Sequence, residues 1–177
     1  MNSAPKKRLQ VGVIGLGRLG RIYARDLASR IPETRLVAVA DVVETAVGEV
    51  ADEFDVRGRY TDPGALINDK DVEAVVIVSP TSTHKDLSIL STRAKKPTFC
   101  EKPPALTLTQ TLEMREAVKA TGTFFQMGFM RRFDPGYAAG KARLGEGKIG
   151  KVVLFKSTSR DPYRTPATYG RDLARLT

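Results

Sequence analysis

Residues 9–20 read LQVGVIGLGRLG, a short apolar run that ends in a glycine-rich turn. The run at residues 9–14 lacks the regular polar alternation of a half-exposed strand, so it predicts a strand buried on both faces. A helix is predicted next, because apolar residues recur at four-residue spacing at Leu19, Tyr23, Leu27 and Ile31. A buried strand that leads through a tight turn into a helix is typical of the start of a parallel α/β fold.

The same alternation of apolar runs and helical patterns continues through the first 130 residues. Strands are predicted at residues 9–14, 36–40, 57–61, 72–79, 98–100 and 123–129. Helical patterns are predicted at residues 19–31, 47–54, 87–94 and 107–121, whereas Asp62-Pro63-Gly64 predicts a turn. The fold class is therefore α/β, a doubly wound parallel sheet of the Rossmann type. Such sheets bind ligands beyond the carboxyl ends of their strands.

The turn after the first strand has the spacing G-x-G-x-x-G, with glycines at Gly15, Gly17 and Gly20. The first glycine allows a tight turn, the second lets a pyrophosphate approach the backbone, and the third lets helix and strand pack closely. We assign these glycines, with Arg18 and Leu19 at the helix start, to cofactor binding. The alternative is a glycine-rich turn that binds no ligand.

The end of the second strand indicates which dinucleotide would bind. Asp41 follows Gly20 by 21 residues, where an acidic side chain accepts hydrogen bonds from the adenine ribose hydroxyls. The next residues, Val42-Val43-Glu44, offer no cation for a 2′-phosphate. NAD is therefore favoured over NADP. The alternative is that Asp41 only caps the following helix.

The fourth and fifth strands also end in residues that can carry chemistry. Ser79-Pro80-Thr81-Ser82-Thr83-His84 follows the fourth strand, and we assign Thr81 and His84 to the cofactor side. His84, the only histidine, is interpreted as a helix-start residue beside the cofactor rather than a catalytic base. Cys100-Glu101-Lys102-Pro103-Pro104 follows the fifth strand, where Lys102 can reach a substrate hydroxyl and Glu101 is assigned to the cofactor. A Glu–Lys surface pair is the alternative.

Composition excludes several classes of protein. The chain has 177 residues and one cysteine, Cys100, so no disulfide can form within it, and a buried thiol is expected there. The apolar run at residues 74–78 is too short to span a bilayer, and residues 1–8 lack the apolar stretch of a secretory signal. We therefore expect a cytoplasmic location and no membrane partner. No metal-binding cluster is predicted.

These motifs, in this order, resemble the Gfo/Idh/MocA oxidoreductases, and the resemblance extends over residues 9–162. Phe99-Cys100-Glu101-Lys102-Pro103 and Gly128-Phe129-Met130-Arg131-Arg132-Phe133-Asp134 are most similar to the inositol dehydrogenase branch. The resemblance implies an NAD(P)-dependent dehydrogenase of sugars, polyols or cyclitols, with substrate held between two domains. It implies that Lys102 is the catalytic lysine and that Met130 and Arg131 line the substrate site with it.

The sequence after residue 130 departs from the family pattern. Residues 131–177 hold 11 basic and 4 acidic residues of a chain whose net charge is +9. Residues 151–159 resemble the first strand of the family's second domain, but no histidine follows to form the family's catalytic Asp–His pair. We therefore divide the chain into a basic tail (1–8), an NAD-binding Rossmann domain (9–130), and a connecting helix with the truncated start of the substrate domain (131–177).

Three functional hypotheses follow from the sequence. The first is an NAD-dependent oxidoreductase that acts on a CH–OH group of a cyclitol or sugar, forming a homo-oligomer if its second domain is complete. The second is a binding module that holds NAD(H) without turnover, which the absence of the Asp–His pair favours for these 177 residues alone. The third, nucleic-acid binding through the basic residues of 131–177, lacks any recognised motif, so no specific nucleic-acid partner is expected.

Overall fold

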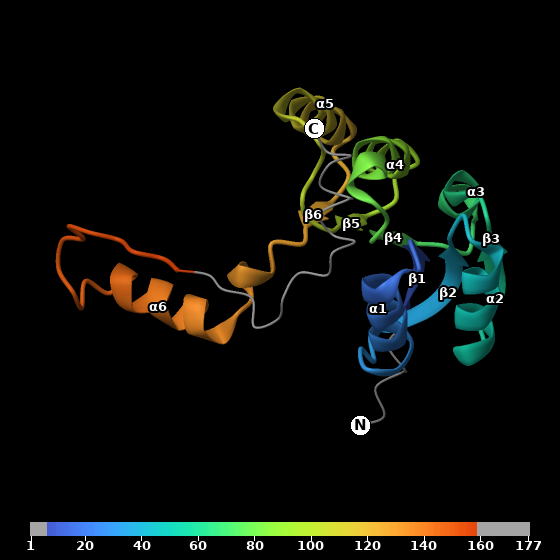
Figure 1. Cartoon of the computed structure of the whole chain (residues 1–177), viewed down its shortest axis with the longest axis horizontal. Helices are drawn as coiled ribbons and strands as arrows, with labels where there is room; N and C mark the ends of the chain where they lie inside the picture. The colour runs from blue at the N-terminus through green and yellow to red at the C-terminus, as the bar shows by residue number, and fades with distance from the viewer. Residues whose placement is uncertain (1–6, 159–177) are drawn as a thin grey trace, which may run out of the picture. The chain divides into compact units, whose positions relative to one another are not determined.

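Six parallel strands form one sheet in the order β3-β2-β1-β4-β5-β6 (Figure 1). The computed structural model describes residues 7–158. The chain starts in the middle of the sheet, so strand order reverses between β1 and β4, which lie side by side. This confirms the doubly wound parallel sheet. The strands are β1 (Leu9–Ile14), β2 (Thr34–Ala40), β3 (Gly58–Tyr60), β4 (Ala74–Ile77), β5 (Thr98–Cys100) and β6 (Phe125–Met127).

Helices cover both faces of the sheet, as the strand pattern predicts (Figure 1). One core cluster joins the β-strand residues Val13 and Val39 to α1 and α2, and a second joins Ile14 and Ile77 to α3 and α4. Neighbouring residues of a strand point to opposite faces, so Val13 and Ile14 enter different clusters. The helices are α1 (Arg18–Ser29), α2 (Glu44–Glu53), α3 (Pro63–Asn68), α4 (Thr81–Arg93) and α5 (Leu108–Thr121).

Two local expectations are wrong. The predicted turn at Asp62-Pro63-Gly64 is the start of α3, because the Asp62 carboxylate accepts hydrogen bonds from the N–H groups of Gly64 (2.9 Å) and Ala65 (3.2 Å). A helix of six residues is too short for its apolar period to show in the sequence. In the first helix, Leu27 of the predicted stripe is buried, but Leu19 and Ile31 are exposed, and α1 buries Gly20 and Ala24 in addition to Leu27.

The described chain divides into two compact units between Gly128 and Phe129. The second unit contains a short 3₁₀ helix, η1 (Met130–Arg132), and α6 (Pro135–Gly145), whose Asp134 cap accepts a hydrogen bond from the N–H of Tyr137. The predicted strand over residues 151–159 is absent from its described part, residues 151–158. A strand requires a hydrogen-bonded neighbour, and none pairs with this segment. Residue 159, the predicted branch motif at 160–163 and the terminal segment 169–177 lie outside the described residues.

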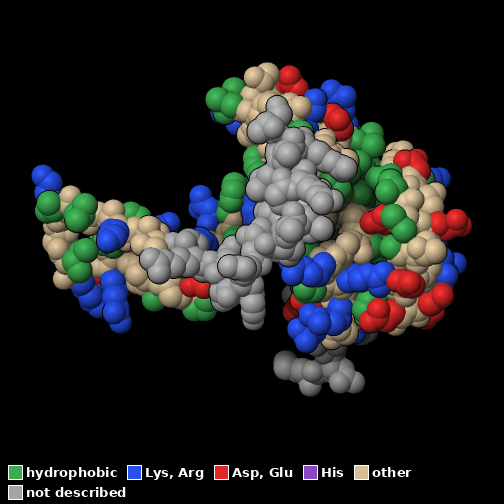
Figure 2. Space-filling model, viewed as in Figure 1, with side chains coloured by type: hydrophobic (Ala, Val, Ile, Leu, Met, Phe, Trp, Pro, Cys, Tyr) green, Lys and Arg blue, Asp and Glu red, His purple; other side chains and the backbone are tan. Residues whose placement is uncertain are grey.

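Surface charge differs between these segments. In Figure 2 the sheet unit shows acidic and basic side chains together, whereas the charged side chains of the α6 segment are mainly Lys and Arg, beside hydrophobic ones. Within residues 7–158 no helix has the length and apolar character needed to cross a membrane.

Candidate functional site

The glycine-rich turn between β1 and α1 is closely packed at two glycines and open at the third. Gly15 has a φ of +92°, and a Cβ atom there would lie 2.6 Å from the backbone of Ser79, at the end of β4. A Cβ atom at Gly20 would lie 1.8 Å from the carbonyl oxygen of Gly15. At Gly17 a Cβ atom would meet nothing within 4 Å. The turn therefore keeps free space only where the sequence predicts that a pyrophosphate approaches.

The start of α1 is suited to an anion. Gly17 caps the helix without any side-chain hydrogen bond, and the first turn contains no acidic residue. Its N–H groups therefore point toward the open space with the positive end of the helix dipole behind them. Arg18 and Leu19 are exposed beside it. These residues fit the diphosphate of a dinucleotide.

Asp41 lies immediately after β2 and is half-buried. Its Oδ2 atom accepts a hydrogen bond from the N–H of Leu16 (2.7 Å), inside the glycine-rich turn, and its Oδ1 atom accepts one from the N–H of Val43 (2.9 Å). Val43 precedes α2 (Glu44–Glu53), and no side chain forms a hydrogen bond at the cap of that helix, so the capping alternative is wrong. The contact with Leu16 also brings the carboxylate against the turn, and each oxygen retains a lone pair for a ribose hydroxyl.

His84 lies in the first turn of α4, as the sequence predicts, and its ring is buried. The ring is only 2% exposed, its Nδ1 atom lies 2.7 Å from the carbonyl oxygen of Pro103, and its Nε2 atom lies 2.8 Å from that of Ser79. Both nitrogens thus face protein acceptors. The structure leaves no ring nitrogen for a direct hydrogen bond to a cofactor or for base catalysis. Thr81, the first residue of α4, is half-buried and makes no hydrogen bond through its hydroxyl to the described residues.

The loop after β5 carries Lys102, which therefore also lies at the carboxyl ends of the strands. Lys102 is exposed, and among residues 7–158 its ammonium group has no hydrogen bond or ion pair. Glu101 is half-buried and does not pair with that ammonium group; its Oε2 atom accepts a hydrogen bond from the backbone N–H of Lys102 (3.0 Å). The alternative of a Glu–Lys surface pair is therefore wrong. Burial raises the pKa of the neighbouring Cys100 thiol from 9.0 to about 11, consistent with a core thiol.

Two residues that the sequence did not single out complete this region. The hydroxyl of Tyr23 on α1 donates a hydrogen bond to Oε1 of Glu101 (2.6 Å), and burial and this hydrogen bond raise the pKa of Tyr23. A Cβ atom at Gly128 would lie 3.1 Å from the Glu101 carboxyl. The sequence pattern places Tyr23 only in the apolar stripe of α1. The sequence signal for the contact with Glu101 is the tyrosine hydroxyl itself, because a buried tyrosine hydroxyl usually finds a hydrogen-bond partner.

Met130 and Arg131 belong to the second unit. The Met130 side chain is 58% exposed. The guanidinium carbon of Arg131 lies 5.2 Å from the ring centroid of Tyr137, and Arg131 also donates a hydrogen bond to the Tyr137 hydroxyl. Their assignment to a substrate site stays a prediction.

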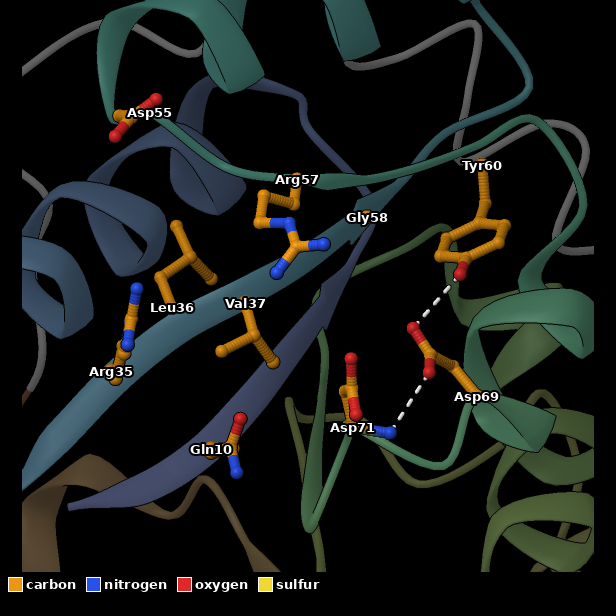
Figure 3. Close-up of a pocket in the computed structure, with 10 residues that line it drawn as sticks. All are labelled: Gln10, Arg35, Leu36, Val37, Asp55, Arg57, Gly58, Tyr60, Asp69 and Asp71. Atoms are coloured by element: carbon orange, nitrogen blue, oxygen red, sulfur yellow. Dashed lines mark hydrogen bonds between the residues drawn. The ribbon is translucent and has the colours of Figure 1, made fainter.

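A separate pocket of about 320 Å³ lies at the opposite, amino-terminal ends of the strands (Figure 3). Asp69 in its wall accepts hydrogen bonds from the hydroxyl of Tyr60 and the N–H of Asp71, which the figure marks with dashed lines. None of the residues assigned to the cofactor lines it. The full lining is Gln10, Arg35, Leu36, Val37, Asp55, Arg57, Gly58, Tyr60, Asp69 and Asp71.

Comparison with protein families decides the classification of this site. Residues 9–129 match the family model described as the Gfo/Idh/MocA oxidoreductase family, NAD-binding Rossmann fold. The chain belongs to this family. The Gfo/Idh/MocA match covers the whole sheet and all of the strand-end loops described above, so its cofactor is NAD and its fold is the Rossmann fold.

Individual relatives within the Gfo/Idh/MocA family are inositol dehydrogenases. The chain is 40% identical over 162 residues to the scyllo-inositol 2-dehydrogenase (NAD(+)) of Bacillus subtilis, covering 92% of this chain and 47% of that protein. It is 40% identical over 163 residues to the myo-inositol 2-dehydrogenase of Thermotoga maritima, covering 92% and 48%. The chain therefore spans about half the length of these curated relatives.

Solved structures agree with the sequence comparison. The scyllo-inositol dehydrogenase of Lactobacillus casei, with bound NAD(H) and scyllo-inositol, superposes with a TM-score of 0.78 at 34% identity, covering 81% of this chain and 43% of that one. This likeness supports the NAD-binding assignment from a second, independent comparison.

Proposed function

We propose that this chain is the NAD-binding part of a dehydrogenase that oxidises a CH–OH group of a cyclitol or related sugar. The observation that carries the proposal is the Lys102 ammonium group, which has no partner among residues 7–158. It lies at the carboxyl ends of the strands, where the glycine-rich turn opens at Gly17. A cofactor lying across the carboxyl ends of the strands would bring its nicotinamide end toward the loops after β4 and β5. The inositol dehydrogenases among its relatives support the substrate class.

The cofactor would be held by three groups of atoms. The N–H groups at the start of α1 would bind the diphosphate, and the space at Gly17 would admit it. The Asp41 carboxylate would accept hydrogen bonds from the adenine ribose and would repel a 2′-phosphate. Thr81 and Glu101 would face the cofactor from the loops after β4 and β5. Glu101 is held in place by hydrogen bonds from the Tyr23 hydroxyl and from the backbone N–H of Lys102. Each of its carboxylate oxygens can still accept a further hydrogen bond.

Lys102 would act on the substrate hydroxyl. When bound, NAD accepts a hydride from the carbon that carries this hydroxyl. The Lys102 ammonium group would donate a hydrogen bond to the hydroxyl oxygen, orient it, and stabilise the negative charge that forms as its proton leaves. His84 would not take that proton, because both of its ring nitrogens face carbonyl oxygens. Met130 and Arg131 would bind the substrate.

We further infer a homo-oligomer and a cytoplasmic location. Exposed apolar side chains of the second unit, such as Val153 (94%) and Phe155 (76%), support association with another chain. The single buried thiol of Cys100 fits a reducing compartment, where proteins seldom rely on disulfides. Size measurements in solution and localisation of the tagged protein would test the two inferences.

Cofactor titration tests the NAD assignment directly. We expect calorimetry to show NAD binding that is stronger than NADP binding, and Asp41→Ala to weaken NAD binding by at least about tenfold, because a charge-assisted hydrogen bond is lost. A matched control is Asp52→Ala, which removes an exposed carboxylate on α2 that pairs only with Arg59. Preference of the unaltered chain for NADP would contradict this interpretation of Asp41.

Turnover tests the role of Lys102. NADH formation is measured with scyllo-inositol, myo-inositol and common aldoses, at protein concentrations high enough to follow a slow reaction. No histidine follows His84 in these residues, so we expect the unaltered chain to bind NAD and to form NADH slowly at most; Lys102→Ala should bind NAD normally and abolish that residual turnover. The control is Lys95→Ala, which removes another lysine of the same unit. NAD binding without NADH formation by the unaltered chain would instead favour the binding-module hypothesis.

A further inference from the structure

The turn that carries Lys102 has few hydrogen bonds of its own. Pro103 and Pro104 have no backbone N–H group, so two successive positions cannot donate. Within the described residues, the N–H of Lys102 donates only to the Glu101 side chain, and the carbonyl of Pro103 is contacted only by His84. Side chains rather than backbone ladders therefore determine the position of this exposed turn.

We propose that Tyr23 and His84 are positioning residues that hold the Lys102 turn from its two ends. This inference deepens the proposed function, on which the role of Lys102 itself rests. Tyr23 comes from α1 and His84 from α4, so each is placed by a helix that packs firmly on the sheet. Neither residue contacts the cofactor or the reacting atoms in this proposal; both act through the turn.

Tyr23 holds the first end of the turn through Glu101. Its hydroxyl donates to Oε1 of Glu101 at 2.6 Å, and the other carboxylate oxygen, Oε2, accepts from the N–H of Lys102 at 3.0 Å. The Tyr23 ring packs against Phe99 with a centroid separation of 5.6 Å, which fixes the direction of the hydroxyl. The absence of a side chain at Gly128 leaves room for the carboxylate in this position.

His84 holds the second end of the turn through Pro103. Nδ1 lies 2.7 Å from the Pro103 carbonyl oxygen, and Nε2 lies 2.8 Å from the carbonyl oxygen of Ser79. The ring therefore joins the loop after β5 to the loop after β4. Because it is only 2% exposed, water does not compete strongly for either carbonyl. Movement of the Lys102 turn away from the sheet would break the contact with Pro103.

Amide hydrogen exchange of the NMR-assigned chain tests the proposal without relying on turnover. The N–H of Lys102 reports opening of the turn, whereas the N–H of Glu101, which donates to the carbonyl of Ile77 at 2.9 Å, reports the sheet. Tyr23→Phe keeps the ring and removes the hydroxyl. We expect it to speed exchange at Lys102 by about tenfold and to leave Glu101 within about twofold.

Tyr60→Phe is the matched control for Tyr23→Phe. It also removes a tyrosine hydroxyl that donates to a carboxylate, here Asp69 at 2.8 Å, but at a site remote from the Lys102 turn. We expect no change in exchange at Lys102. Acceleration equal to that of Tyr23→Phe would show a general loss of stability and would overturn the Tyr23 part of the proposal.

Two amide substitutions separate the contacts of His84. The Asn nitrogen is attached to Cγ, as Nδ1 is, so His84→Asn places an N–H donor near Pro103; the Gln nitrogen lies one atom further out, nearer the position of Nε2, and places a donor near Ser79. We expect about tenfold faster exchange at Lys102 in His84→Gln and near-normal exchange in His84→Asn. Equal exchange rates in the two variants would overturn the His84 part.

The same samples distinguish this inference from the proposed function. NAD titration of the unaltered chain tests the cofactor assignment, and its failure would leave the exchange results valid. Unchanged exchange at Lys102 in both Tyr23→Phe and His84→Gln would overturn the positioning proposal even if NAD binds. Equal acceleration across β4, β5 and the turn would also overturn it, because the two side chains would then stabilise the domain as a whole.

Discussion

The two units of this chain differ most in whether their apolar side chains are buried. The unit that ends at Gly128 buries Val, Ile and Leu residues on both faces of its sheet, with Val13, Val39 and Ile77 at 0% exposure. In the second unit every described residue, from Phe129 to Thr158, is exposed. Apolar residues alone therefore do not make a core. Strands need neighbours on both edges, and helices need a surface on which to pack.

Glycine substitution gives the largest expected contrast between the units. We expect Gly20→Ala to lower the free energy of unfolding by at least about 4 kcal/mol, because its Cβ atom would lie 1.8 Å from the Gly15 carbonyl oxygen. Gly140→Ala on α6, where a Cβ atom meets nothing within 4 Å, should change it by less than about 1 kcal/mol. Thermal unfolding followed by circular dichroism measures both. Similar melting of the two variants would remove the contrast.

A second pair of substitutions compares the open space at Gly17, where we expect the cofactor to bind, with the open space at Gly140 on α6, where we do not. At both Gly17 and Gly140 an added Cβ atom would meet no other part of the protein within 4 Å, so Gly17→Val and Gly140→Val each start a side chain in open space. We expect Gly17→Val to fold and to lose at least about 100-fold in NAD affinity, because the side chain occupies the pyrophosphate position. Gly140→Val should bind NAD normally. Normal binding by Gly17→Val would show that the turn is not the cofactor site.

The buried thiol of the first unit predicts a smaller, pH-dependent effect. Burial raises the pKa of Cys100 from 9.0 to about 11, so the unfolded thiol ionises first as pH rises. Stability from this group is fully present below pH 9 and is lost progressively up to about pH 11, by about 3 kcal/mol at most. Urea unfolding at pH 8 and pH 11 should show a smaller decrease in Cys100→Ala. Equal decreases in both proteins would contradict the prediction.

The smallest expected effect concerns association through the second unit. Residues 152–155 are consecutive exposed apolar side chains, with Val153 at 94% exposure. We expect sedimentation to show concentration-dependent self-association, and Val153→Asp to weaken it about fivefold, which corresponds to about 1 kcal/mol. Leu108→Asp, at a 74% exposed residue of the first unit, is the control. A monomeric chain at high concentration would contradict the prediction.

The sheet could be predicted from sequence signals that depend only on neighbouring residues along the chain. Buried strand runs and the spacing of Gly15, Gly17 and Gly20 predicted the parallel fold and the turn geometry that the structure shows. Asp41 was predicted at the end of β2, and it lies there against the turn. These features are local, because each depends on the backbone conformation of a few residues or on the side-chain period of one element.

Signals that depend on distant residues were not visible in the sequence. The contact of Tyr23 with Glu101 joins residues 78 positions apart, and that of His84 with Pro103 joins residues 19 apart. Nothing in the local pattern indicates that a tyrosine in an apolar stripe or a histidine in a first helical turn will meet these acceptors. The predicted strand at 151–159 failed for the same reason, because pairing is a property of two segments rather than one.

The hydrogen bond between Asp41 and the N–H of Leu16 has a consequence for attempts to engineer cofactor preference. Replacing the aspartate to admit a 2′-phosphate would also remove the acceptor that ties the end of β2 to the glycine-rich turn. A single substitution at Asp41 would relieve the repulsion of the 2′-phosphate. It would also loosen the glycine-rich turn that binds the diphosphate of both NAD and NADP. Redesign toward the phosphorylated coenzyme therefore calls for two simultaneous changes: a new cation for the phosphate, and a neutral acceptor that restores the bond to Leu16.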